Sequence, residues 1–237
     1  MKINVKRYSN ETSPKEDFID YEVNLESPTL LEALHEIKTT QDATLTYSSG
    51  CRSSVCGSCA VRVNGREVLA CAYKVKDGDR VEHLGNVEVI RDLVVNMDKA
   101  LECNATSKAW LSQKNPNAKL SIADEKINEI QSDCILCGSC YSVCPVYAVN
   151  DAFKGPFALT RVWKYVSDKR ELDAQEKIDT IQSNGIWDCT LCNECTVVCP
   201  QGISSKADIE KLRMKSASFG YGDPNFANMD FGGGLSF

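Results

Sequence analysis

The stretch at residues 134–145, CILCGSCYSVCP, decides the fold of this chain, and it has a twin at residues 189–200, CTLCNECTVVCP. Both follow the spacing C-x2-C-x2-C-x3-C-P, in which three cysteines bind one iron–sulfur cluster and the fourth binds a second cluster. The sequence therefore predicts two [4Fe-4S] clusters that exchange their fourth ligands. The predicted ligand sets are Cys134, Cys137, Cys140 and Cys199 for the first cluster, and Cys189, Cys192, Cys195 and Cys144 for the second.

The tight spacing has a physical reason. Thiolates three residues apart follow a helical turn and wrap one corner of a cubane, so the fourth ligand has to come from elsewhere. Pro145 and Pro200 have a fixed φ and no N–H, which turns the chain away after the last ligand. A pair of zinc sites is the alternative, although zinc runs usually combine two close ligands with two distant ones. Buried, unreactive thiols are a further alternative.

Length and composition limit the number of domains and the classes of protein to which the chain can belong. The chain has 237 residues, 13 cysteines and a net charge of −6, which suggests one or two domains. Cysteines this clustered are typical of metal sites in a reducing compartment, not of a disulfide framework. The start, MKINVKRYSN, has no apolar segment typical of a signal peptide, and we expect no membrane span. The acidic balance argues against a nucleic-acid partner.

The first third of the chain predicts a β-grasp domain. Residues 29–38 place Leu30, Leu31, Leu34 and Ile37 on one helical face. Two strands precede this helix, with a turn region at 9–14, and more strands follow it, two of them flanking the hairpin signal Asn64-Gly65. The expected strands are residues 2–8, 18–24, 45–47, 60–63, 67–70, 80–83 and 87–90.

A third cysteine group lies between the predicted helix and hairpin. Cys51, Cys56 and Cys59 have the spacing C-x4-C-x2-C with a distant fourth, Cys71, which is the plant-type [2Fe-2S] spacing. Gly50 and Gly57 would let the backbone bend close to the cluster and aim N–H groups at its sulfurs. The alternative is a cysteine-rich loop without metal.

The second half predicts an all-helical domain. Residues 92–110 suggest a helix that carries the lone Cys103, which we interpret as a buried apolar residue. Ser121 and Asp124 resemble a capping box. The other expected helices are residues 156–167, with a core-facing stripe of Leu159, Val162, Trp163 and Val166, residues 173–183, and a helix from Ser204 or Ser205 to about residue 215.

The predicted fold class is therefore α+β. We expect a [2Fe-2S] β-grasp ferredoxin domain at 1–100, an α-helical two-cluster ferredoxin domain at 101–215, and a tail at 216–237. The tail is rich in Gly and aromatic residues and cannot form a core by itself. We expect it to lie along a partner subunit through Phe219, Tyr221, Phe226, Phe231 and Phe237.

Other functional signals are weak. His35 and His83 are isolated in the sequence, and we expect plain surface or packing roles for both. Trp163 and Tyr165 are better explained by core packing than by an electron relay. We find no nucleophile triad, phosphate-binding glycine loop or dinucleotide fingerprint.

Taken together, the chain up to about residue 215 resembles the iron–sulfur subunit of succinate dehydrogenase and fumarate reductase. The most specific pieces are CRSSVCGSCAVRVNG at 51–65, VIRDLVV at 89–95 and DCILCGSCYSVCP at 133–145. The resemblance implies a relay of single electrons between a partner flavoprotein subunit, which holds FAD, and a quinone or membrane-facing subunit. It implies that electrons pass from the cluster bound by Cys51 to the cluster bound by Cys134 and then to the cluster bound by Cys189. It also implies that this chain has no substrate-site residues.

Three positions depart from the family pattern. Most members lack a cysteine at the position of Cys192 and hold a [3Fe-4S] cluster there, so Cys192 predicts [4Fe-4S], with [3Fe-4S] as the alternative. Thr190 replaces a frequent His, and Val149 replaces a frequent Trp at the quinone pocket. These departures resemble the subgroup of 8-methylmenaquinol and thiol-dependent fumarate reductases, whose membrane-facing partner is a cysteine-rich subunit.

Other interpretations stay open on the sequence. One is a diffusible ferredoxin-like electron carrier, another is the subunit of a related flavin oxidoreductase with a different substrate, and a third is a zinc-stapled interaction module. For the leading interpretation we expect a peripheral position on the cytoplasmic face of a membrane, or on the periplasmic face if a partner carries the folded subunit across.

Overall fold

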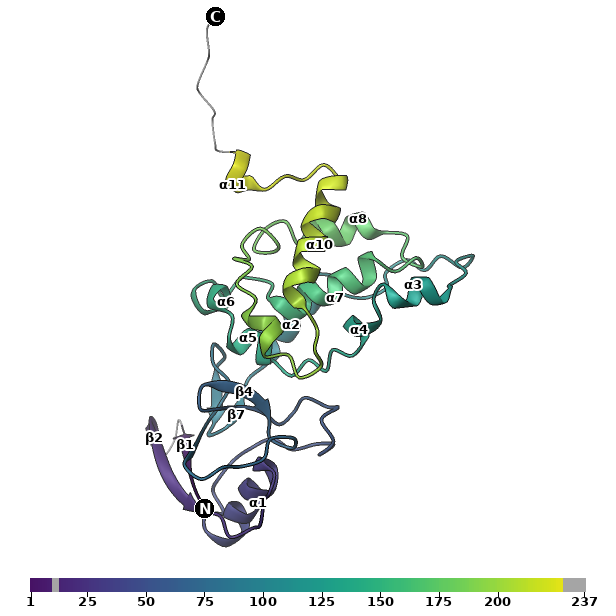
Figure 1. Ribbon diagram of the computed structural model, residues 1–237. Coiled ribbons are helices and arrows are strands. Elements are labelled where there is room, and N and C mark those ends of the chain that lie inside the picture. The colour runs from purple at the N-terminus through teal and green to yellow at the C-terminus, as the bar shows by residue number, and fades with distance from the viewer. Residues whose placement is uncertain (10–12, 228–237) are drawn as a thin grey trace, which may run out of the picture.

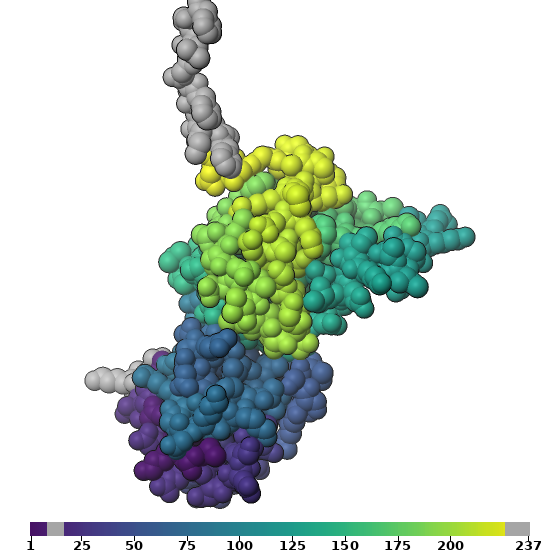
Figure 2. All heavy atoms as spheres, viewed as in Figure 1, coloured from purple at the N-terminus to yellow at the C-terminus, as the bar shows by residue number. Residues whose placement is uncertain are grey.

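The computed structural model describes residues 1–9 and 13–227. The chain forms a sheet-containing part followed by a helical part, with helix α10 crossing the helical part toward the C-terminus (Figure 1). Figure 2 shows the two parts as separate masses that meet at a narrower waist. The predicted α+β order of the chain is confirmed.

Seven strands of the described residues form one sheet in the order β4-β3-β5-β1-β6-β7, and β2 pairs antiparallel with β1 along nearly its whole length. The central pair, β1 and β5, is parallel, and Val5 stands opposite Val81. Ile3 and Val5 point into the core, as the alternation of β1 predicts. The strands are β1 Lys2–Ser9, β2 Ser13–Glu22, β3 Ala60–Val63, β4 Arg66–Leu69, β5 Asp79–Glu82, β6 Val89–Arg91 and β7 Val94–Val95.

Helix α1, Leu30–Thr40, packs against this sheet with the predicted apolar face. Thr29 caps it, because the Thr29 side chain accepts from the Glu32 backbone N–H while the Glu32 carboxylate accepts from that of Thr29. Leu30, Leu34 and Ile37 are fully buried. The apolar periodicity of the sequence was therefore sufficient to predict this helix.

Two predictions between the strands are wrong. Residues 45–47 form no strand, and the Thr46 N–H donates to a side chain instead of a neighbouring strand, at 2.8 Å to Asp92 Oδ2. Residues 92–97 are not helical either. Asp92 has a φ of 48°, and this left-handed turn folds β7 back onto β6. Helix α2 therefore spans only Asp98–Thr106, and residues 107–110 of the expected helix are not helical either.

The helical part is built around α7, Pro156–Val166, which packs beside α10, Ser205–Ser218. Leu159, Val162 and Val166 of the predicted stripe are buried, and Trp163 is partly buried against the same core. The remaining helices are α2 Asp98–Thr106, α3 Ile122–Lys126, α4 Glu129–Ser132, α5 Ser139–Ser142, α6 Pro145–Val149, α8 Ala174–Thr180, α9 Glu194–Val197 and α11 Pro224–Ala227. The predicted capping box of Ser121 and Asp124 starts α3.

The predicted boundaries at residues 100 and 215 stay a prediction, and both fall inside helices, α2 and α10. After α10, Phe219 and Tyr221 pack partly against the helical core of this chain. The other predicted tail anchors, Phe231, Phe237 and the side chain of Phe226, lie outside the described residues. Among the described residues, no helix combines the length and apolarity that crossing a membrane requires.

Candidate iron–sulfur centres

The loop before β3 and the end of β4 bring the first cysteine group together. Cys59 immediately precedes β3 and Cys71 follows β4, and these strands are antiparallel with Ala60 opposite Leu69. Cys59 and Cys71 therefore lie at the same end of the hairpin. Cys51 and Cys56 sit in the preceding loop, and both are exposed.

Backbone N–H groups in this loop point at the cysteine sulfurs. The N–H groups of Ser53 and Val55 donate to Cys51 Sγ at 3.3 and 3.4 Å. The Cys51 N–H donates to Cys56 Sγ at 3.4 Å. Such donors stabilise the negative charge of thiolates that bind a cluster, so the loop fits the predicted [2Fe-2S] group.

The loop reaches this shape through unusual backbone angles. Arg52 and Ser54 have φ values of 58° and 61°, which the sequence did not suggest, and Gly57 has 74°. Gly50 is needed for a different reason, because an added Cβ would lie 2.9 Å from Cys56 Sγ. The sequence thus predicted the close approach at Gly50 but not the turns at Arg52 and Ser54.

The thiols of this group differ in their surroundings. Hydrogen bonds from Ser58 and from the Cys51 backbone lower the pKa of the exposed Cys56 to about 6. Burial raises the pKa of Cys59 to about 11. The exposed edge of the site therefore favours a thiolate, while the inner edge requires a positive partner to hold its charge.

The four cysteines predicted for the first cubane line one cavity. Cys134, Cys137, Cys140 and Cys199 all border it, together with apolar neighbours such as Phe157. The spacing suggested that Cys134, Cys137 and Cys140 follow one continuous helical turn, but they do not. Only Cys140 is helical, on α5, because Leu136 and Gly138 have φ values of 53° and 82° and unwind the chain before it.

The second group repeats this arrangement. Cys144, Cys189, Cys192 and Cys195 line another cavity. Leu191 and Asn193 have φ values of 56° and 74°, in the same places as Leu136 and Gly138 of the first row. Asn tolerates the left-handed conformation better than most residues. Gly138 and Asn193 stand at the same place in the two rows, so these residue types indicated the turn in the sequence. Pro145 starts α6, and Cys144 caps it.

Burial and mutual repulsion disfavour thiolates at both cubane sites. The pKa of Cys140 is raised well above its usual value by burial and by the neighbouring cysteines. Burial raises the pKa of Cys195 to about 12. Clustered soft sulfur donors of this kind fit iron–sulfur clusters, whose irons hold cysteines in the thiolate form. No group of three or more His, Cys, Asp or Glu in the described part of the chain is arranged around a single metal ion.

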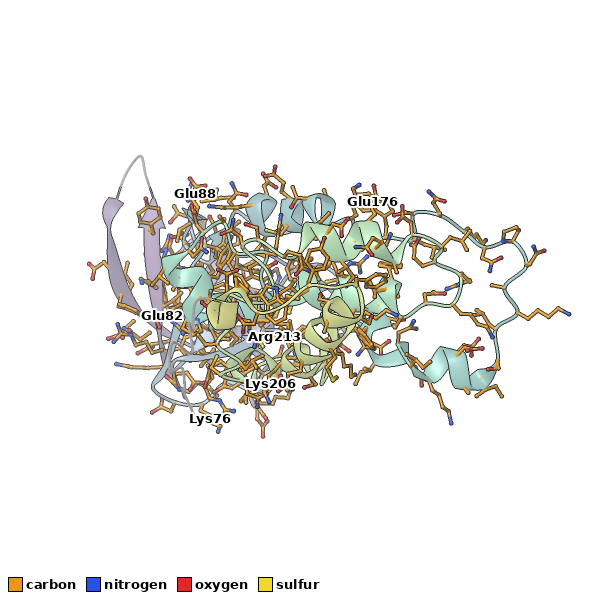
Figure 3. The ribbon with its side chains drawn as sticks, turned by 90° about the horizontal axis from the view of Figure 1, so that it is seen from above. Lys76, Glu82, Glu88, Glu176, Lys206 and Arg213 are labelled. Atoms are coloured by element: carbon orange, nitrogen blue, oxygen red, sulfur yellow. The ribbon has the colours of Figure 1, made fainter. Side chains whose placement is uncertain are left out.

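Basic side chains of α10 support the second row. Arg213 donates to the carbonyl oxygens of Ile186 at 2.9 Å and Cys189 at 2.7 Å, which fixes the start of that row. Lys206, at the start of the same helix, lines the second cavity, and Figure 3 shows both side chains. Burial raises the pKa of Cys189, and the Arg213 charge opposes that rise. Sequence reasoning missed both residues, because neither lies near a cysteine in the chain.

The three cysteine groups lie next to one another. Gly57 of the first loop is so close to the first row that an added Cβ would lie 2.7 Å from the Ile135 oxygen and 3.0 Å from Cys137 Cα. Gln201 donates to the Ser54 oxygen at 3.1 Å, which ties the same loop to the residues after Cys199. The two cubane groups in turn are joined by the single turn of α5.

Two of the three residues that depart from the family pattern line the second cavity. Thr190 and Cys192 line it, and Cys192 is exposed. Val149, at the end of α6, is 87% exposed. Cys103 is buried on α2, and its Sγ lies 4.0 Å from the Phe153 oxygen.

The histidines lie outside all three groups of cysteines. His83 Nδ1 is 2.7 Å from the Leu84 oxygen, and His35 Nδ1 is 3.4 Å from the Tyr47 hydroxyl. Each therefore makes a local contact within the sheet-containing part. Their expected packing roles agree with these contacts.

Comparison with protein families divides the chain in the same way. The model of the 2Fe-2S iron-sulfur cluster binding domain matches residues 2–102. The model of the 4Fe-4S dicluster domain matches residues 130–203. The predicted cluster types are thus confirmed, whereas the assignment of each cysteine to a cluster stays a prediction.

Comparison with individual proteins identifies the family. The chain is 35% identical over 235 residues to the 8-methylmenaquinol:fumarate reductase iron-sulfur subunit of Wolinella succinogenes, across 93% of this chain and 74% of that protein. It is 35% identical over 230 residues to the fumarate reductase iron-sulfur subunit of Escherichia coli O6:H1, across 92% of this chain and 93% of that protein.

A solved structure shares the fold. A chain of the Mycobacterium smegmatis Sdh1 complex in the apo form superposes with a TM-score of 0.81 at 23% identity, across 93% of this chain and 97% of that chain. Together with the two sequence relatives, this likeness extends over nearly the whole molecule. The chain belongs to the family of iron–sulfur subunits of fumarate reductases and succinate dehydrogenases.

Proposed function

We propose that this chain relays electrons within a succinate/fumarate oxidoreductase complex, between a flavoprotein subunit that holds FAD and a quinone or cysteine-rich, membrane-facing subunit. When bound, its clusters accept and release single electrons, whereas a flavin releases two. The observation that carries the proposal is the contiguity of the three cysteine groups, with Gly57 against Cys137 and the α5 turn between the cubane groups.

The proposed ligand sets of the two cubane clusters follow the cavities, and that of the [2Fe-2S] cluster follows the loop before β3 and the end of β4. Cys51, Cys56, Cys59 and Cys71 would hold the [2Fe-2S] cluster. The first cavity provides Cys134, Cys137, Cys140 and Cys199 for one [4Fe-4S] cluster, and the second provides Cys144, Cys189, Cys192 and Cys195 for the other. Because Cys192 supplies a fourth sulfur at the second cavity, a [4Fe-4S] cluster fits there better than [3Fe-4S].

The protein's own contribution is to position the clusters and to shield them from water. Apolar side chains such as Phe157 and Ile203 line the first cavity beside its cysteines and limit the access of water. Backbone N–H groups of Ser53 and Val55 support the outer cluster. We place the substrate-binding residues on the flavoprotein partner, so this subunit would influence turnover through electron flow alone.

The residues that depart from the family pattern bear on which partner accepts the electrons. With Val149 exposed where the family often has Trp, the usual quinone pocket lacks one of its residues on this chain. We therefore favour a cysteine-rich, membrane-facing partner at the second cubane, as in the subgroup with the additional cysteine. We place the complex peripherally on a membrane, on its cytoplasmic face.

Replacing Cys51 with Ser in the purified complex tests the proposal. The variant should lose electron flow from flavin to the natural acceptor, while the flavoprotein keeps its activity with an artificial dye that accepts electrons directly. The matched control is Cys103→Ala, which removes a sulfur that belongs to none of the proposed ligand sets. Unimpaired turnover with the natural acceptor in the Cys51→Ser complex would contradict the relay, and so would a purified complex that contains no flavin.

A further inference from the structure

The Gly85-Asn86 turn, which follows β5, reaches across the waist of the molecule to the first cysteine row. The Asn86 Nδ2 lies 3.1 Å from the Tyr141 oxygen, 2.9 Å from the Ser142 oxygen and 3.1 Å from the Cys144 oxygen. One amide of the sheet-containing part therefore serves three carbonyl groups of the helical part. No cysteine is involved through its sulfur, so sequence motifs give no sign of this contact.

These carbonyls lie at the end of α5, the single helical turn between the two cubane cavities. The last carbonyl groups of a helix have no partner within it, and a helix of four residues is not stable by itself. Cys140, on this turn, lines the first cavity, and Cys144, just after it, lines the second. Whatever holds the end of α5 therefore sets how the two cavities face each other.

Two arms of the sheet-containing part thus reach the turn: the Asn86 amide is the first, and Gly85 with Glu67 is the second. The Gly85 N–H donates to Ser142 Oγ at 2.7 Å, and the Ser142 hydroxyl donates to Glu67 Oε1 of β4 at 2.7 Å. The Glu67 side chain is fully buried and pairs with Arg62 at 3.1 Å. Because the hydroxyl both accepts and donates, its orientation is fixed. Both arms thus join the sheet that carries Cys59 and Cys71 to the turn that carries Cys140.

We propose that Asn86 is a positioning residue: its amide holds the α5 turn and thereby fixes the separation between the [2Fe-2S] site and the first [4Fe-4S] site. This rests on the proposed electron-transfer function. Electrons pass between the two sites at a rate that depends on their separation, so a turn that moves would slow the relay without removing any ligand. Asn86 is exposed, so replacing it leaves the core packing intact.

The test variants separate the amide from the backbone. Asn86 has a φ of 58°, which Gly adopts freely, so Asn86→Gly removes only the amide. Asn86→Asp replaces the donors by oxygens that face three carbonyl groups. The matched control is Asn64→Gly: Asn64 is also exposed, has a φ of 50°, and donates to Asp79 Oδ1 at 2.8 Å within the sheet-containing part.

The measurement is the magnetic interaction between the reduced [2Fe-2S] and [4Fe-4S] centres of the full-length, cluster-loaded chain, by electron paramagnetic resonance after chemical reduction. We expect weaker and more broadly distributed coupling in Asn86→Gly and Asn86→Asp at unchanged iron content, and unchanged coupling in Asn64→Gly. In the complex, flavin-to-acceptor electron flow should fall several-fold in the two Asn86 variants alone. Unchanged coupling in both Asn86 variants overturns the proposal.

Loss of clusters from the Asn86 variants would still leave a decisive comparison. Ser142→Ala cuts the second arm and keeps the Asn86 contacts with the backbone carbonyls, so it should keep its clusters and most of the coupling. The same loss of clusters in Ser142→Ala would overturn the proposal, because the Asn86 amide would then not be what holds the turn. The spectroscopic comparison needs no partner subunit. Failure of the unmodified complex to pass electrons would contradict the proposed function and leave the positioning result intact.

Discussion

Gly57 lies against Cys137, although 80 residues of chain and the whole sheet-to-helix junction separate them: a Cβ on Gly57 would come within 3.0 Å of both the Cα and the Cβ of Cys137. Gly57 lies between Cys56 and Cys59, and Cys137 is a proposed ligand of the first cubane. Backbone next to proposed ligands of neighbouring clusters thus makes one of the close contacts between the two parts. Short separations favour electron transfer, so this contact fits a relay.

Replacing Gly57 with Ala should therefore damage both stability and electron flow. Ala at a φ of 74° costs about 1–2 kcal/mol. The added methyl group would also meet the Ile135 carbonyl oxygen, which as backbone cannot move aside easily. We expect a larger loss of unfolding free energy than the conformational cost alone, measured by urea denaturation, and weaker coupling between the first two clusters.

Gly65 provides the control for that experiment. It has a φ of 80°, and an added Cβ would meet nothing within 4 Å. Gly65→Ala should carry only the conformational cost and leave the clusters untouched. Equal losses in the two variants would show that Gly57 is needed for its φ and not for its closeness to Cys137.

Cys192 should matter to one cluster alone. Replacing it with Ser removes a proposed ligand of the second cubane, so that site should lose one iron or become unstable, while the other two clusters stay intact. Iron analysis and electron paramagnetic resonance measure this change. Cys103→Ala, at a buried cysteine outside the proposed sets, should keep the full iron content. Normal iron content in Cys192→Ser would refute the assignment.

The fold and most of the site could be predicted because the information was local. Cysteine spacing indicated the three groups, and apolar periodicity indicated α1 and α7. The β7 turn could not be predicted, because it depends on Asp92, whose carboxylate bonds to the distant Thr46 and Arg7. The contact of Asn86 with the α5 turn joins residues 55 to 58 positions apart, and spacing along a chain carries no sign of such a contact.

The sheet-containing part should lose stability in alkali through Tyr21. Burial and a hydrogen bond to Asp42 raise the pKa of this phenol from 10.0 to about 12. The fold therefore favours the protonated form, so its contribution is complete below pH 10 and is lost as the pH rises toward 12. The loss is at most about 1.4 kcal/mol for each pH unit in this window.

Urea denaturation of the cluster-loaded chain between pH 9 and pH 11.5 measures this dependence. Tyr21→Phe should be less stable at pH 9, because the hydroxyl bonds to Asp42 and Arg7 are gone, and should show a shallower decline above pH 10. The same decline in both proteins would assign the alkaline loss to other groups.

The central claim is that this chain carries electrons between a flavoprotein and an acceptor, and rapid mixing tests it most directly. The oxidised complex is mixed with succinate, frozen within milliseconds and examined by electron paramagnetic resonance. The account predicts that cluster signals appear before the acceptor is reduced, and that the Cys51→Ser complex shows neither event. Reduction of the acceptor at the normal rate while every cluster stays oxidised would contradict it.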